Sequence, residues 1–396
     1  MKKIYQTLGV MSVTFLLASC SDNTHNGSEE TVNKDETVEQ MDEGAEQDTD
    51  MMDEAVDEET TDEAVMDEED PVADEDQATD DSEAQGVTFK LGYGAPHGER
   101  SFSAIFVGLD GDTITHVHID EFQFMDTAGD YHGVPNADSD FGEAYDENQV
   151  LISKVENNEA YSELMAEKAE ATHSLVDGYE AISEFAEGKT ISELEEAIEE
   201  LHHVEDPSGI SDVVSGATLV DTPGYLEEIV NVAKDGFEFS TDKVEDIANV
   251  ELSYSLQAPH GSKSFALVGV LHQDDIILAT IQDELQFMEA TDVEGVPNSD
   301  QAFGEAYNEN TILISKLANT EIYSELMADK GEATKTYDEN HRTISEFVAG
   351  MTVQELQAAI DKLDGKDTEE NADVVSGATF VDKKGYLEAI LNTIQK

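Results

Sequence analysis

The chain has 396 residues, of which 92 are acidic and 20 are lysine or arginine, giving a formal net charge of −72 at pH 7. Electrostatic repulsion on this scale excludes nucleic acids and anionic membrane surfaces as partners. The single cysteine excludes an intramolecular disulfide, a cysteine-ligated iron–sulfur cluster and a CxxCH haem attachment. Ordinary hydrophobic cores must therefore stabilise the folded part of the chain.

Residues 1–20, MKKIYQTLGVMSVTFLLASC, are typical of a secretory signal. Lys2 and Lys3 form a basic start, and the apolar stretch 8–18 is too short to span a bilayer. The segment ends in LASC, which resembles the lipobox of bacterial lipoproteins. This resemblance implies that Cys20 carries diacylglycerol and palmitate and anchors the mature protein to the extracytoplasmic face of the cell membrane. The alternative is an ordinary signal peptide with an incidental cysteine.

Residues 21–86 consist mainly of Glu and Asp, with Thr, Ala and Met scattered between them. Such a segment cannot bury enough apolar surface to offset chain entropy, and its like charges repel one another. The composition predicts a disordered acidic linker that gives solubility and reach. Cation binding is the alternative function for this segment.

The rest of the chain is an internal duplication. GAPHGERSF at 94–102 matches QAPHGSKSF at 257–265, and GVPNADSDFGEAY at 133–145 matches GVPNSDQAFGEAY at 295–307. A period this long indicates two copies of one domain and not a solenoid. We therefore expect two tandem homologous domains, the first over 87–235 and the second over 250–396.

Each copy changes its hydrophobic period partway along, which predicts an α+β fold with an antiparallel sheet and helices. Residues 101–125 alternate around Asp110-Gly111, as expected for a hairpin. Helical spacing begins near 157, and Thr190 with Glu193 forms a capping box before a further helix. Pro223 marks the first turn of a last helix in the first copy.

The heptapeptide DVVSGAT occurs unchanged at 212–218 and at 373–379, in the loop that enters this last helix. Gly216 permits positive φ and close backbone approach, and free N–H groups at a helix start attract phosphate. Thr218 presents a hydroxyl at the end of the turn. From these residues alone the segment is either a phosphate-binding loop with an attachable alcohol or a tight turn with a buried threonine.

DVVSGAT is similar to the flavinylation motif of FMN-binding domains in the Na+-pumping NADH:quinone oxidoreductase and the Rnf complex. In that family an ApbE-type flavin transferase joins the phosphate of FMN to the last threonine. The resemblance implies two covalently bound FMN groups, on Thr218 and Thr379. The other cofactor-binding positions that it implies are Asp212, Ser215, Gly216 and Ala217 in the first copy, and Asp373, Ser376, Gly377 and Ala378 in the second. The common SGATxT extension is missing, which argues against the ion-pump subunits themselves.

The combination of a lipobox, a polar linker and two such domains resembles the PplA-type lipoproteins of Gram-positive extracellular electron transfer. This resemblance implies an electron-transfer flavoprotein without substrate turnover of its own. A membrane NADH dehydrogenase or quinol would be the donor, and ferric iron or soluble flavin the acceptor. The alternative is a non-redox lipoprotein that binds a substrate or a peptide.

Three further groups of residues are candidates with competing interpretations. The APHG segments contain His97 and His260 and are followed by Arg100 and Lys263, either as cations that contact the flavin or as part of a purely conformational turn, and the second is favoured. His116 and His118 share one strand face, either as a metal pair or as a solvated strand face, and their counterparts Ala279 and Ile281 favour the second. Phe124 and Phe287 are candidate walls for a flavin ring.

Overall fold

The computed structural model describes residues 85–169, 171–204, 209–217, 219–244, 249–331, 333–363, 375, 377–379 and 382–396. The signal segment, Cys20 and all but the last two residues of the acidic linker 21–86 lie outside the described residues.

The fold is α+β, with two antiparallel sheets, and the order of elements in the first copy recurs in the second. The first repeat contains β1 (Gln85–Gly94), β2 (Ser101–Asp110), β3 (Thr113–Asp126), η1 (Gly142–Ala144), β4 (Gln149–Ser153), α1 (Asn158–Ala169), α2 (Leu175–Ala186), α3 (Ile191–His202), α4 (Ile210–Val213) and α5 (Thr222–Asp235). After β5 (Phe237–Val244), the second contains β6 (Glu251–Gln257), β7 (Ser264–Gln273), β8 (Ile276–Glu289), η4 (Gly304–Ala306), β9 (Thr311–Ser315), α6 (Thr320–Gly331), α7 (Tyr337–Val348), α8 (Val353–Leu363) and α10 (Lys383–Gln395).

The strand orders are β4-β3-β2-β1-β5 in the first sheet and β6-β7-β8-β9 in the second. The hairpin predicted around Asp110-Gly111 joins β2 to β3, and Gly111 has a φ of 58°. The segment between the two predicted domains, residues 236–249, is called the connecting segment; it contributes β5, which pairs antiparallel with β1. The first sheet therefore has one strand more than the second.

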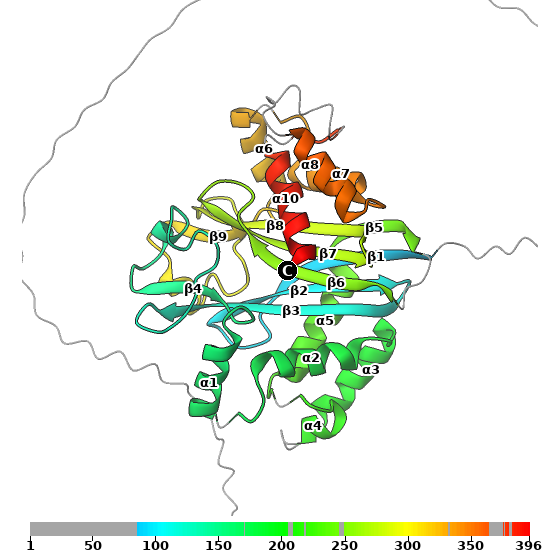
Figure 1. The fold of residues 1–396 in the computed structure, drawn as a ribbon. Helices are drawn as coiled ribbons and strands as arrows, with labels where there is room; N and C mark the ends of the chain where they lie inside the picture. Colours follow the sequence, from blue (N-terminus) through cyan, green and yellow to red (C-terminus); the bar gives the residue numbers. More distant parts are fainter. Residues whose placement is uncertain are drawn as a thin grey trace, which may run out of the picture. The chain divides into compact units, whose positions relative to one another are not determined.

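The two repeats belong to one compact unit. Helices α2 and α5 pack on the first sheet, and α7 and α10 on the second, while the two sheets contact each other (Figure 1). Nine of the ten residues of β2 and of β7 are buried, because one face of each strand meets helices and the other meets the opposite sheet. Alternation in these strands therefore separates two buried faces.

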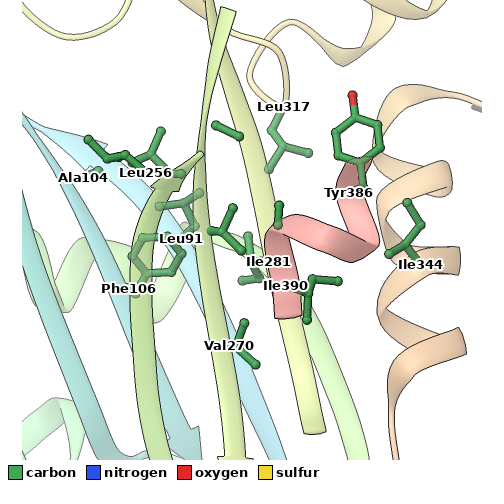
Figure 2. Packing of buried hydrophobic residues seen from close by; sticks show 14 of the residues in the cluster. Leu91, Ala104, Phe106, Leu256, Val270, Ile281, Leu317, Ile344, Tyr386 and Ile390 are labelled. Carbon is green, nitrogen blue, oxygen red and sulfur yellow. The ribbon is translucent and has the colours of Figure 1, made fainter. Parts of the chain in front are cut away.

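Aromatic side chains fill the space between the sheets. Phe102 and Phe122 of the first repeat have ring centroids 5.1 Å apart, and Phe122 reaches Phe265 of the second at 5.8 Å. In Figure 2, Leu91, Ala104 and Phe106 of the first repeat lie in the same cluster as Leu256 and Ile281 of the second. Residues from both repeats thus share one core, so neither copy buries its inner face alone.

Local sequence signals set the helix starts. Thr190 caps α3 through the predicted capping box with Glu193. Ser174 and Asp177 form an equivalent box at α2. Pro223 lies in the first turn of α5, where its missing N–H costs nothing.

The GVPN loop of each repeat forms hydrogen bonds with the APHG loop of the other repeat. The amide nitrogen of Asn136 donates to the carbonyls of Gly261 (2.9 Å) and Ser264 (2.7 Å). Asn298 makes the matching bonds to Gly98 and Ser101, both 2.7 Å. The two asparagines have φ of 66° and 65°, a conformation that asparagine tolerates better than most residues. We call these paired contacts the reciprocal asparagine contacts.

A second reciprocal pair lies deeper between the sheets. The Tyr254 hydroxyl of the second repeat donates to the buried Asp120 carboxylate (3.0 Å), and the Tyr93 hydroxyl of the first donates to Asp283 (2.7 Å). Burial raises the pKa of Asp120 to about 7 and that of Asp283 to about 6, although hydroxyl and backbone donors oppose the shift. The inter-repeat surface is therefore specified by polar bonds as well as by apolar packing.

Candidate functional site

In the first repeat the DVVSGAT segment begins in the short helix α4, and its residues from Val214 to Ala217 form a turn before α5; in the second repeat the described residues of the segment, 375 and 377–379, also precede a helix. Gly216 and Gly377 have φ of 88° and 93°, which only glycine adopts at little cost. In the second repeat the N–H of Ala378 donates to the carbonyl of Val375 (3.3 Å), and both residues are buried. The same bond joins Ala217 to Val214 in the first (3.1 Å), so the two turns share one conformation, anchored by apolar residues.

Of the two candidate acceptors, the structure describes Thr379. It is partly buried, its N–H donates to the Asn340 side-chain oxygen (2.6 Å), and its hydroxyl lies 3.1 Å from that oxygen. Thr218, Asp373 and Ser376 lie outside the described residues, as does the side chain of Asp212. Ser215 is exposed beside the turn.

The APHG loop lies beside the helix that the acceptor loop enters. His97 Nδ1 is 2.6 Å from the Asp221 carboxylate, and His260 Nδ1 is 2.7 Å from Asp382. Each aspartate comes three residues after the candidate acceptor threonine and is the N-cap residue of α5 or α10. Two segments far apart in the sequence therefore meet within four residues of the acceptor position.

The His260–Asp382 contact has an electrostatic signature. The hydrogen bond to Asp382 raises the pKa of His260, with burial opposing it, and the same bond lowers the pKa of Asp382. The pair therefore favours imidazolium beside carboxylate. Both side chains remain nearly half exposed, so solvent screens the interaction.

Arg100 and Lys263 are exposed, and Gly98 and Gly261 take φ of 64° and 65° in the same turns. This geometry agrees with a conformational role for the APHG turn. The close packing of Gly224 and Gly385 against the backbone of Pro96 and Pro259 explains why the loop sits so near the helix start.

A buried ion pair in each repeat was not found by the sequence analysis. Lys154 Nζ is 2.6 Å from Glu121, and Lys316 Nζ is 2.6 Å from Glu284, with all four side chains at most 1% exposed. Burial is the largest single influence and would raise the pKa of Glu121, but the charges of Lys154 and His97 and the hydrogen bonds from Lys154 and Ser101 together outweigh it and hold that pKa at about 2. The repeated LISK sequence, a lysine closing an apolar strand, was the available signal.

These ion pairs connect to the APHG loops. The Ser264 hydroxyl lies 3.0 Å from Glu284 and 3.3 Å from the carbonyl of His260. Tyr386, one turn into α10, donates to the same glutamate at 3.0 Å. A buried polar network therefore runs from the helix that follows the acceptor loop to the His260 loop, and it fixes their relative position.

Phe124 and Phe287 pack between the repeats, with Phe124 5.1 Å from Phe303 and Phe287 5.2 Å from Phe141. Their role as walls of a flavin ring stays a prediction. The face bearing His116 and His118 was expected to be open to solvent; this expectation is wrong, because the second repeat covers most of it and leaves both histidines only partly exposed. His116 Nε2 lies 2.7 Å from the Val250 carbonyl, and the His118 ring lies 4.3 Å from Tyr254.

A cavity of about 320 Å³ opens between the repeats. Its wall includes Tyr93 of β1, Glu228 and Val232 of α5, and Val296 and Pro297 of the second GVPN loop. Of the DVVSGAT residues that the structure describes, none lines it. The cavity is thus separate from the described part of the candidate acceptor loops.

Comparisons with protein-family models, curated proteins and solved structures found no match to this chain. Within the described ranges, no helix is both long and apolar enough to cross a membrane. The same part of the chain holds no cluster of three or more His, Cys, Asp or Glu side chains arranged to bind a metal ion.

Proposed function

We propose that the protein is a lipid-anchored extracytoplasmic electron carrier with two FMN groups, each bound through its phosphate to Thr218 or Thr379. The observation that carries this proposal is the repeated acceptor loop. In both copies a positive-φ glycine and a buried alanine directly precede the threonine position, and a helix begins a few residues later. A duplicated loop of this chemistry suits attachment of a phosphate group.

The residues around Thr379 fit such a group. Gly377 leaves the inner side of the turn without a side chain, and Ala378 points into the core. Thr379 is only partly buried, which suits modification by an enzyme. A flavin held by its phosphate would supply reversible electron transfer, because its ring system is left unmodified.

The donor in this proposal is a membrane NADH dehydrogenase or quinol, and the acceptor is ferric iron or soluble flavin. Cys20 would hold the chain at the membrane, and residues 21–86 would let the folded repeats move between donor and acceptor. A covalent link suits an exposed carrier, since a dissociable cofactor would be lost by dilution.

The test is intact mass after co-expression with an ApbE-type flavin transferase. We expect two FMN additions that survive denaturation, and Thr218→Ala and Thr379→Ala should each remove one. Thr172→Ala, which changes an exposed threonine outside the motif, is the matched control and should keep both. Two additions in either acceptor variant would show that the acceptor assignment is wrong.

The anchor has its own test. Cys20→Ala should release the protein into the medium or leave it unprocessed, measured by cell fractionation. Unchanged membrane retention with normal processing would contradict lipidation at Cys20.

The second candidate function is a non-redox lipoprotein that binds a small ligand or a peptide, and the cavity beside Tyr93 and Val296 favours it. The flavin measurement separates the two. A colourless protein with no added mass, despite active transferase, would support the binding function.

A further inference from the structure

The second acceptor loop has a cation that the first lacks. Lys335 immediately precedes the N-cap of α7, and its Nζ donates to the Thr343 hydroxyl at 2.9 Å. The ammonium also covers the glycine turn: a Cβ placed on Gly377 would lie 3.3 Å from Lys335 Nζ. The backbone N–H of Lys335 points at the Thr379 hydroxyl oxygen at 3.4 Å. Main chain and side chain of one residue therefore flank the acceptor.

Asn340 fixes the acceptor from the other side. Its amide nitrogen donates to the carbonyls of Lys335 (3.1 Å) and Thr336 (2.9 Å), which can only accept. The side-chain oxygen must then face Thr379, where it accepts from the backbone N–H and from the hydroxyl. Because Asn340 is fully buried, this arrangement is held rigidly.

The first repeat has none of these groups at the corresponding positions. His173, Gly178 and Ala181 stand where the second repeat has Lys335, Asn340 and Thr343. His173 is exposed and its Nδ1 contacts the neighbouring Thr172 hydroxyl. A Cβ on Gly178 would meet the Leu219 side chain at 3.1 Å, so an asparagine does not fit there without rearrangement. The two loops share a backbone conformation but not their surroundings.

The positive charge of Lys335 would be stabilised by a bound anion. A lysine ammonium has three donors, and Thr343 accepts one of them. Among the residues that the structure describes, no carboxylate lies within ion-pair distance of this ammonium, although acidic residues outnumber basic ones more than fourfold in the chain.

We infer that the second repeat contains an oxyanion site, in which Lys335 binds a phosphate ester carried on Thr379 and Asn340 positions that threonine. The first repeat holds its phosphate without a comparable cation. The inference rests on the proposed function for the identity of the phosphate. It adds that the two attachment sites are inequivalent and names the residues responsible.

The experiment uses the full chain co-expressed with the flavin transferase, in Thr218→Ala and Thr379→Ala backgrounds that leave one acceptor each. Phosphorus-31 NMR then reports on a single phosphate in each protein. Lys335→Gln should shift the resonance of the Thr379-linked phosphate, and Lys335→Arg should restore its position. His173→Gln in the other background is the matched control and should leave the Thr218-linked resonance unchanged.

Thermal unfolding gives an independent readout. Flavin loading on Thr379 should raise the Tm, and Lys335→Gln should remove about 2 °C of that rise, the size expected of one partly exposed charge-assisted contact. Loss of loading on Thr379 in Lys335→Gln, with unchanged circular dichroism and rescue by Lys335→Arg, would also support the site.

The two proposals fail differently. One outcome would overturn the oxyanion site and leave the proposed function intact. In it, both threonines carry flavin, and Lys335→Gln changes neither the Thr379-linked resonance nor the rise in Tm on loading. Absence of flavin from both threonines would overturn both.

Discussion

Replacing His118 by isoleucine, the residue at the matching position of the second repeat, should make the protein less sensitive to acid. The His118 ring packs on Tyr254, and within the described part of the chain its Nε2 is buried without a hydrogen-bond partner. Burial, with a smaller contribution from the Lys396 charge, lowers the pKa of His118 from 6.5 to about 4. The second repeat shows that this strand position accepts isoleucine, because Ile281 is fully buried in β8.

The direction in which pH changes stability follows from proton uptake by the unfolded chain. Below pH 6.5 the unfolded chain protonates this histidine, while the folded protein keeps it neutral down to about pH 4. Stability is therefore lost as pH falls through this window, and the loss amounts to at most about 2 kcal/mol at pH 5. Removing the unpaired Nε2 adds a gain of about 1 kcal/mol that does not depend on pH.

The assay is urea unfolding followed by circular dichroism between pH 8 and pH 5. We expect the stability advantage of His118→Ile over the natural protein to grow by about 2 kcal/mol between these limits. His132→Gln removes an exposed imidazole and is the control for histidine number. Asp120 lies on the same strand face, so the complete pH curves of all three proteins are compared. An advantage equal at pH 8 and pH 5 would refute the burial argument.

Two further outcomes are expected. Asn298→Gly keeps the positive φ but loses both hydrogen bonds to the other repeat. Amide hydrogen exchange should therefore become faster at residues 98–101 and stay unchanged at 261–264. Equally faster exchange at both segments would contradict the reciprocal asparagine contacts. Lys154→Met should lower the free energy of unfolding by about 3–5 kcal/mol by leaving Glu121 buried and unpaired, and adding Glu121→Gln should recover much of the loss in chemical denaturation. A double variant as unstable as the single one would show that the lost packing, not the charge, matters.

Local features of the fold were predictable because nearby residues determine them. The Asp110-Gly111 turn requires positive φ at the glycine, and the capping box at Thr190 needs only a partner three residues on. The loop around Gly377 was predictable for the same reason. Strand β5 was also predictable, since Phe237 and Phe239 alternate with polar residues, but the sequence analysis did not predict a strand in the connecting segment.

What the sequence did not reveal depends on contacts between the repeats. Alternation along β3 separates two faces but does not say what covers each, so His118 was assigned to solvent although the second repeat covers it. The packing of Phe124 against Phe303 of the second repeat could not be predicted for the same reason. Lys335 and Asn340 could not be predicted from the internal duplication, because the duplication marks residues that the two copies share and the copies differ at these two positions.

The reciprocal asparagine contacts have a consequence for symmetry. Asn136 donates hydrogen bonds to the second repeat, and Asn298 donates the equivalent bonds to the first. The same contact therefore occurs twice between the repeats, once in each direction. A protein with one copy of this domain would satisfy these bonds only by pairing with itself across a two-fold axis. In such a homodimer every substitution appears in both halves at once. When both halves lie in one chain, this restriction no longer applies. The second site can then have a lysine, Lys335, where the first has a histidine, His173.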